Sequence, residues 1–290
     1  MTATPRPDSR PVPPGLHFIA TPIGTARDIT LRALDILAGA DALAAEDTRS
    51  LRHLMEIHGV PLGGRPLLAY HDHNGAQMRP RILQMLAEGR SVAYASEAGT
   101  PLVADPGYQL ARAAIAAGHP VHAAPGPSAV LAALTVAGLP TDRFLFAGFP
   151  PPSGNARRTW LAELSDVPAT LVMYESPKRI GRLLTDLAET AGEDREAAVC
   201  RELTKRFEEI RRGTLKDLAA AFADQPVKGE IVLVVDRPRP RAADPAAVGA
   251  ALADALTRMG VKQAAAEVAE RFGLPRRAVY QMALDMEGRE

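Results

Sequence analysis

The sequence contains a single cysteine, Cys200, so it can form no internal disulfide and offers no Cys-x-x-Cys pair for zinc or redox chemistry. It also lacks net charge, because 34 lysines and arginines balance 34 aspartates and glutamates. No global field therefore draws the chain to nucleic acid or to an anionic membrane, and a polyanionic partner would have to be met by local basic patches. The lack of disulfides fits a reducing cytoplasm best.

Long hydrophobic runs are absent too. The most apolar region, 123–139, is interrupted by Pro125, Gly126 and Pro127 and falls short of the roughly 20 residues that a membrane span needs. Residues 1–14 mix prolines with polar residues and have no apolar signal-peptide segment, so we expect a disordered leader. Neither GxxxxGK[ST] nor GxGxxG occurs, which leaves a P-loop or a dinucleotide fingerprint unsupported.

The chain has 290 residues, of which 47% are hydrophobic and 23% charged. This length and composition predict a globular protein of two domains with a full core. In the first half, short apolar runs alternate with amphipathic stretches, which predicts an α/β domain over 15–138 with a largely parallel sheet. We expect strands at 16–20, 42–45, 67–70, 91–95 and 121–124 and helices at 29–38, 82–86, 107–117 and 128–137.

The second half predicts another α/β domain over 139–236, then a linker over 237–247 and a helical extension over 248–290. In the extension, Gly273 is placed to end one helix and Leu274-Pro275 to begin the next, with Arg276 and Arg277 at its head. This spacing fits a helix-turn-helix that meets phosphates, or a hairpin that only packs. The expected strands are 144–149, 169–174, 197–202 and 230–235, and the expected helices are 177–188, 215–222, 248–258 and 261–286.

Several turns of small residues directly follow predicted strands of the first domain. Open α/β sheets bind ligands at the carboxyl ends of their strands, where glycine lets a ligand approach the backbone. One such turn alone is more often a simple chain reversal, but several together predict a small-molecule site. The candidate cofactor-binding residues are Thr21, Pro22, Gly24, Ala98, Gly99, Thr100, Pro101, Pro125, Gly126 and Ser128.

Charged and polar residues also follow these strands. Glu46, Asp47 and Arg49 come after one strand, and His71-Asp72-His73-Asn74 comes after the next. His71 and His73 with Asp72 could suggest a metal site, but metal ligands usually need a third partner and a preorganised geometry. We therefore favour polar contacts of His71, His73 and Asn74 to a ligand or to RNA.

In the second half, charges again adjoin apolar strands. A charge in that position is expected to be partly buried and functional, which applies most to Glu175 and Glu202. Runs of surface arginines are more often solvated, whereas Cys200 is expected to be a small core residue. The further candidates here are Lys205 and the basic residues Arg157, Arg158, Lys178, Arg179 and Arg201.

Taken in order, the motifs over 16–235 resemble those of the small-subunit ribosomal RNA methyltransferases of the tetrapyrrole methylase superfamily. Two positions depart from the usual pattern, with Glu97 in place of Asp and Thr25 in place of Asn. The matching motifs are Thr21-Pro22-Ile23-Gly24, Ala45-Glu46-Asp47-Thr48-Arg49, His71-Asp72-His73-Asn74, Ala98-Gly99-Thr100-Pro101, Asp105-Pro106-Gly107-Tyr108, Pro125-Gly126-Pro127, Leu139-Pro140-Thr141-Asp142-Arg143-Phe144, Tyr174-Glu175-Ser176, Arg201-Glu202-Leu203-Thr204-Lys205 and Lys228-Gly229-Glu230.

The resemblance implies S-adenosylmethionine-dependent 2′-O-methylation of a decoding-centre cytidine of 16S rRNA, within the assembled small ribosomal subunit. It also implies a homodimer of two-domain subunits with the cofactor in the cleft between the domains, and no metal. A weak 2′-hydroxyl nucleophile needs a proton acceptor. The candidates, among which the sequence does not choose, are Glu46, Asp47, Glu175, Glu202 and Lys205.

For the RNA, we expect Arg49 and Arg201 to orient phosphate or carboxylate groups. Further phosphate contacts are expected from Arg157, Arg158, Lys178, Arg179, Arg276 and Arg277. Two alternatives stay open at this point: a methylase of the same superfamily that acts on carbon atoms of a tetrapyrrole, and a non-catalytic module that binds RNA or DNA through its C-terminal helices.

Overall fold

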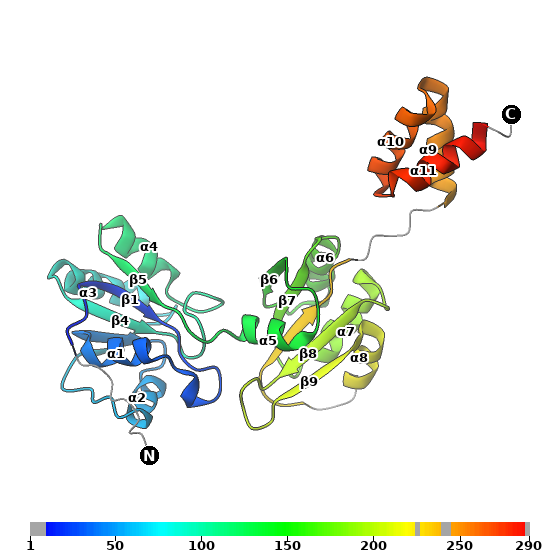
Figure 1. Ribbon diagram of the computed structural model, residues 1–290. Coiled ribbons are helices and arrows are strands. Elements are labelled where there is room, and N and C mark those ends of the chain that lie inside the picture. Colours follow the sequence, from blue (N-terminus) through cyan, green and yellow to red (C-terminus); the bar gives the residue numbers. More distant parts are fainter. Residues whose placement is uncertain (1–9, 224–226, 239–244, 288–290) are drawn as a thin grey trace, which may run out of the picture. The chain divides into compact units, whose positions relative to one another are not determined.

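The first half of the chain forms a fully parallel five-stranded sheet in the order β3-β2-β4-β1-β5, with helices on both faces (Figure 1). The computed structural model describes residues 10–223, 227–238 and 245–287 and divides into two units, 1–237 and 238–290. The strands are β1 (Gly15–Ile19), β2 (Ala42–Ala45), β3 (Leu67–Ala69), β4 (Ser91–Ala95) and β5 (Val121–Ala124). The observed bounds of each strand agree with the predicted bounds to within one residue at either end.

Helices cover both faces of this sheet because its central strands are apolar on both sides. On one face, α1 (Leu31–Gly39) and α2 (Thr48–Ile57) pack with Leu43 of β2 into one buried cluster. On the other, α3 (Gly75–Ala87) and α4 (Tyr108–Ala116) pack with Tyr94 of β4 into a second cluster. A short 3₁₀ helix, η1 (Ala26–Asp28), follows the turn after β1.

Three expectations for this half need correction. The helix predicted at 82–86 begins at Gly75, because the side chain of Asn74 folds back to accept from the His71 N–H and fixes the turn that starts α3. No bounds were predicted for α2, although His53 and His58 were expected near a helix end, and His58 is the C-cap residue of this helix. Residues 1–9 of the predicted disordered leader lie outside the described residues. Residues 10–14 pack on the domain: Val12 packs against the buried cluster that α1 and α2 form with Leu43, and the Pro13 carbonyl accepts a hydrogen bond from His17.

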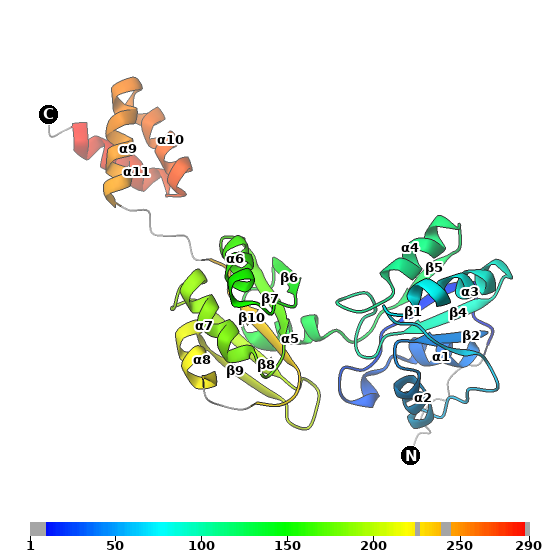
Figure 2. The ribbon, with the colours of Figure 1, turned by 180° about the vertical axis from the view of Figure 1, so that it is seen from behind.

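The second sheet is mixed, in the order β6-β7-β10-β8-β9 (Figure 2). Only the pair β6–β7 is parallel, and β10 and β9 run antiparallel to their neighbours. The strands are β6 (Phe144–Gly148), β7 (Thr170–Glu175), β8 (Glu196–Arg201), β9 (Glu209–Thr214) and β10 (Ile231–Val235). Strand β9 was not predicted, because its sequence, EIRRGT, carries three charges, and its arginines left open whether the stretch is a solvated surface run.

One face of this sheet is covered by α6 (Gly154–Ser165), α7 (Ile180–Ala191) and α8 (Leu215–Phe222), and the other by α5 (Ala129–Ala137). Cys200 is fully buried in the α5 cluster, where burial raises the pKa of its thiol to about 11, so its prediction as a core residue is confirmed. Because α5 packs on the second sheet, it belongs by contact with the second domain rather than with the predicted domain 15–138.

The C-terminal unit is a three-helix bundle with a core of its own. It consists of α9 (Pro245–Arg258), α10 (Val261–Phe272) and α11 (Arg276–Glu287). The predicted break at Gly273 is confirmed: this residue ends α10 in a left-handed conformation with φ of 64°. Helix α9 begins at Pro245, so the predicted linker 237–247 ends earlier than expected. Residues 239–244 of that linker lie outside the described part of the chain. Across the described helices, none combines the length and the apolar character of a membrane span.

Candidate functional site

Three of the predicted cofactor-binding turns meet at the carboxyl edge of the parallel sheet. Thr21 and Gly99 exchange backbone hydrogen bonds of 3.0 Å in both directions, and the Thr21 hydroxyl donates to the carbonyl of Ser96. The Thr100 hydroxyl donates to the carbonyl of Pro127 at 2.9 Å. The turns after β1, β4 and β5 are thereby tied into one assembly, as expected when parallel strands end at the same edge.

A cavity of about 220 Å³ opens beside this assembly. One side is polar and is formed by Thr21, Ser96 and Glu97. The other is formed by α2, which contributes Leu51, Leu54 and Ile57 together with Ser50 and His53. Of the predicted cofactor residues, Thr21, Pro22 and Gly24 line it directly; Ala98, Gly99, Thr100, Pro101, Pro125, Gly126 and Ser128 lie in the adjoining turns.

Glycines at this edge permit close approaches that a side chain would block. A Cβ on Gly126 would lie 3.0 Å from Cβ of Ala20. A Cβ on Gly24 would lie 2.5 Å from the Thr204 hydroxyl oxygen and 2.6 Å from Cγ of Lys205. The Thr204 hydroxyl oxygen also accepts from the backbone N–H of Thr25 at 3.2 Å. The β1 turn and the loop between β8 and β9 are therefore in direct contact.

Carboxyl groups gather next to the cavity, at the ends of β2 and β4. The Glu46 carboxylate accepts a hydrogen bond from the backbone N–H of Glu97, while burial, and then the charge of Glu97, raise the pKa of Glu46. Burial, reinforced by the charges of Glu46 and Glu97, raises the pKa of Asp105 to about 7. Asp105 belongs to the motif Asp105-Pro106-Gly107-Tyr108, but its burial, the main cause of the raised pKa, has no local sequence signal.

Asp47 and Arg49 serve the start of α2. The Asp47 carboxylate accepts from the backbone N–H groups of Arg49 and Ser50, which makes it the N-cap residue of this helix. The hydrogen bond from the Arg49 side chain, followed by the bond from its backbone, lowers the pKa of Asp47. The Arg49 side chain is 91% exposed and so remains accessible from solvent.

The segment after β3 is a turn rather than an extended strand. The rings of His71 and His73 lie edge to face with centroids 6.0 Å apart, and Asn74 holds the turn by donating to the Ala69 carbonyl. Nδ1 of His71 is buried and has no hydrogen-bond partner among the described residues. The part of the chain that the structure describes contains no group of three His, Cys, Asp or Glu side chains able to hold a metal.

The candidate site residues of the second domain lie at the edge of the sheet where β6, β7 and β8 end. Glu175 is fully buried in its side chain, and its Oε1 accepts from the Ser176 N–H and from Nε of Arg179, each at 2.7 Å. Its Oε2 is buried and has no partner among the described residues. Lys178 is exposed beside this pair.

Glu202 and Lys205 form a second ion pair at this edge. Nζ of Lys205 donates to Glu202 at 3.2 Å and to Glu230 at 2.9 Å, and the Glu202 carboxylate also accepts from the Glu230 N–H. That backbone hydrogen bond is the main reason why the pKa of Glu202 is lowered. Partial burial lowers the pKa of Lys205, but the hydrogen bonds that Lys205 donates to Glu230 and Glu202 outweigh this effect, so its pKa is raised.

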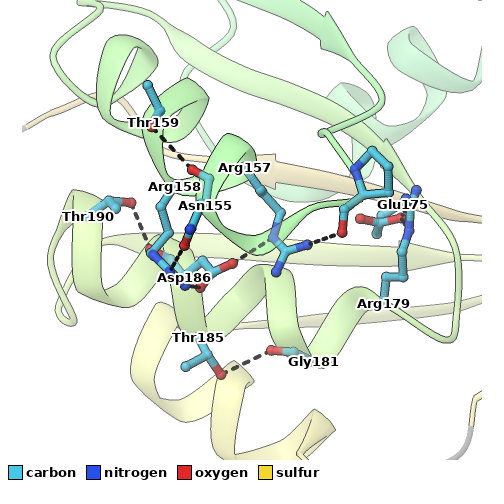
Figure 3. A network of polar contacts seen from close by, with 11 residues as sticks. Asn155, Arg157, Arg158, Thr159, Glu175, Arg179, Gly181, Thr185, Asp186 and Thr190 are labelled. Atoms are coloured by element: carbon cyan, nitrogen blue, oxygen red, sulfur yellow. Dashed lines mark hydrogen bonds and ion pairs between the residues drawn. The ribbon is translucent and has the colours of Figure 1, made fainter.

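Besides Arg49 and Arg179, which pair with Asp47 and Glu175, three more of the predicted RNA-binding arginines are engaged within the protein. Arg157 is buried and its Nε lies 2.6 Å from Oδ2 of Asp186, while Arg158 reaches the other oxygen at 3.4 Å (Figure 3). This network joins α6 to α7, so the burial of Arg157 argues for a structural role. Arg201 pairs with Glu209 across the β8–β9 hairpin at 2.9 Å.

Two family models match the chain. The model of the tetrapyrrole (corrin/porphyrin) methylases covers residues 15–219, and that of the RsmI C-terminal HTH domain covers 242–287. Curated proteins named ribosomal RNA small subunit methyltransferase I are similar over most of their length. That of Mesorhizobium japonicum is 47% identical, covering 96% of this chain and 94% of the relative. That of Escherichia coli is 40% identical, covering 94% and 96%.

Solved structures share the fold at lower identity. The methyltransferase CobJ has 22% identity and a TM-score of 0.60, with 80% of this chain and 97% of that chain covered. Diphthine synthase has 16% identity and a TM-score of 0.59, with 76% and 89% covered. These likenesses establish the two-sheet α/β architecture without bearing on the substrate.

Proposed function

Because the chain belongs to the ribosomal RNA small subunit methyltransferase I family of the tetrapyrrole methylases, we propose that it carries out S-adenosylmethionine-dependent 2′-O-methylation of a decoding-centre cytidine in 16S rRNA. Its substrate would be the assembled small ribosomal subunit. The observation that carries the proposal is the carboxyl edge of the parallel sheet, where the turns, the cavity and the raised-pKa carboxyl groups of Glu46 and Asp105 come together.

The residues at this edge fit the proposed methyl donor. Its sulfonium and ammonium charges would be complemented by Glu97 and Asp105, and its adenosine by Leu51, Leu54 and Ile57 on the α2 side of the cavity. Pockets for drug-sized ligands measure about 300–1,000 Å³. At about 220 Å³ the cavity would hold one part of the donor, and the neighbouring turns would contact the rest.

When bound, S-adenosylmethionine would supply an electrophilic methyl group, which the ribose 2′-oxygen takes as the carbon–sulfur bond breaks and its electron pair stays on sulfur. We propose that Glu46 accepts the hydroxyl proton, with Asp105 beside it. A raised pKa makes Glu46 a better base near neutral pH. The other candidates suit that role less: the pKa values of Asp47 and Glu202 are lowered, Lys205 is held protonated, and Glu175 is paired with Arg179.

For the RNA backbone, the accessible cations are the best candidates. Arg49 and Lys178 are exposed, as are Arg276 and Arg277 at the head of α11. Phosphate contacts of this kind give affinity that falls with salt. We also propose a division into two α/β domains, with α5 in the second, and the donor in the cleft between them. We further propose a homodimer and a cytoplasmic location. Light scattering of the purified protein tests the dimer.

The decisive experiment supplies labelled S-adenosylmethionine and small subunits from cells that lack this chain, then maps 2′-O-methylation on the rRNA. We expect one methylated cytidine ribose. Glu46→Gln should slow single-turnover methylation by about 10²–10⁴-fold while donor binding stays within threefold. Glu88→Gln, at an exposed site at the end of α3, is the matched control and should leave the rate unchanged. An unchanged rate in Glu46→Gln would remove Glu46 from the mechanism.

The same assay separates the alternatives. Methylation of a precorrin instead of rRNA would favour a carbon methylase of the wider superfamily. Retained RNA affinity without any donor binding by calorimetry would favour a non-catalytic binding module.

A further inference from the structure

The loop that joins β8 to β9, residues 202–208, is held in a strained and fixed conformation. Glu202 and Thr204 have positive φ angles of 52° and 61°, a left-handed conformation that is strained for residues other than glycine. Hydrogen bonds within the loop hold it: the Lys205 N–H donates to the Glu202 carbonyl at 2.9 Å, and the Thr204 N–H donates to the Glu208 carboxylate at 2.6 Å. Strain held by so many contacts indicates a functional segment.

The loop presents an aromatic ring to solvent. Phe207 is 62% exposed, the highest value for a phenylalanine among the described residues, whereas Leu203 of the same loop is buried. The guanidinium of Arg206 lies 5.4 Å from the centroid of the Phe207 ring. Within the described residues Arg206 has no ion pair, so its charge is available together with the ring.

The pair differs from the other cation–π pairs described. Arg211 lies over Phe222, whose ring is buried in the core, and Arg271 lies over the half-buried Phe272. Only Phe207 among these rings is largely open to solvent in the described structure. A rigid loop that exposes an apolar ring beside a cation favours a planar, electron-rich ligand.

The position of the loop connects the ring to the proposed methylation site. Thr204 contacts Thr25 and Gly24 in the turn next to the cavity. Phe207 lies three residues further along the chain, a separation that spans at most about 10 Å. A base held at Phe207 would therefore keep its own or a neighbouring ribose close to the carboxyl edge of the parallel sheet.

We infer that Phe207, together with Arg206, forms a stacking site for an unpaired nucleobase of the substrate RNA, beside the ribose that is methylated. Single-stranded RNA is recognised mainly by stacking of unpaired bases on aromatic rings and on arginine. The inference deepens the proposed function and rests on it for the identity of the RNA.

The test compares Phe207→Ala, Phe207→Leu and Phe207→Trp in small-subunit binding and in KM for methylation. Loss of one stacked base should weaken binding and raise KM about 10- to 100-fold in Phe207→Ala. Phe207→Leu should be similarly impaired, because it keeps apolar area without an aromatic face. Phe207→Trp should retain wild-type values. Donor affinity and thermal stability should not change in any of them.

Ile115→Ala is the matched control, since Ile115 is 64% exposed on α4 and should affect neither value. KM and binding within threefold of wild type in Phe207→Ala, or a fully active Phe207→Leu, would overturn the stacking site. If the wild-type protein binds small subunits in a Phe207-dependent manner but methylates no ribose, the proposed function fails and the stacking site stands. If the wild type methylates and Phe207→Ala does so equally well, only the stacking site fails.

Discussion

Replacing Asp105 by asparagine should stabilise the protein above pH 7 and leave its stability unchanged below pH 4. Burial is the main cause that raises the pKa of this carboxyl group to about 7, and the charges of Glu46 and Glu97 add to it. The folded protein therefore holds a proton on Asp105 that the unfolded chain has already released at neutral pH. Ionised Asp105 is a destabilising group in the native state.

The size of the effect follows from the shift. A rise in pKa from 3.8 to about 7 corresponds to about 4 kcal/mol of lost stability once Asp105 is ionised. Asp105 is only half-buried, so solvent screening reduces this to roughly 2 kcal/mol. The penalty is absent below the unfolded pKa, grows between pH 4 and 7, and is complete above pH 7, because the folded pKa is the higher of the two.

Urea unfolding of wild type and Asp105→Asn at pH 4, 5.5 and 8 measures this difference. We expect equal stability at pH 4 and an advantage of about 2 kcal/mol for the variant at pH 8. The proposed donor gives a second readout. Since ionised Asp105 would attract the sulfonium, wild-type donor affinity should rise as the pH increases through about 7, and Asp105→Asn should lose that dependence. Identical pH dependence of wild type and variant in both assays would refute a raised pKa at this position.

Other substitutions test the packing around the site. Arg157→Leu leaves Asp186 buried without its close partner and should lower the free energy of unfolding, measured in urea, by about 3–5 kcal/mol. Arg158→Ala removes a half-exposed side chain and should lower it by under about 1 kcal/mol. Equal losses in the two variants would contradict a structural role for the buried Arg157–Asp186 pair. Gly24→Ala brings a methyl group against the β8–β9 loop and should weaken donor and RNA binding, while Gly249→Ala, in open space on α9, should stabilise by up to about 1 kcal/mol. Asp47→Ala should cost about 1 kcal/mol through loss of the α2 cap, and no loss of stability would show that the cap is dispensable.

The strands of the first sheet could be predicted because they are short apolar runs that end at small-residue turns. The pattern of β4, from Ser91 to Ala95, is as clear in the sequence as in the structure. Strand β9 could not be predicted in this way, because it lies at the edge of its sheet and its residues Arg211 and Arg212 imitate a solvated loop. Helix α3 was predicted too short because Pro80 and Gly75 are poor helix formers that tertiary packing tolerates.

The candidate site shows the same division. That the turns near Thr21, Gly99 and Pro127 meet follows from the parallel sheet, since strands that point the same way end at the same edge. The sequence could not show which charged side chains lack an ion-pair partner, because the two partners of an ion pair can lie far apart in the chain. Arg157 and Asp186, for example, are 29 residues apart and meet only when α6 packs on α7.

The order of residues alone thus specified the α/β architecture, the break at Gly273 and the turns at the sheet edge, all of which depend on local patterns of apolar, small and charged residues. Tertiary structure decided the chemistry of the side chains. Burial and neighbours from other elements raise the pKa of Asp105 and lower that of Glu202, and the fold of the loop between β8 and β9 leaves Phe207 exposed while Leu203 is buried. Electrostatic energies depend on distance in space and on exclusion of water, and neither is encoded in a short stretch of sequence.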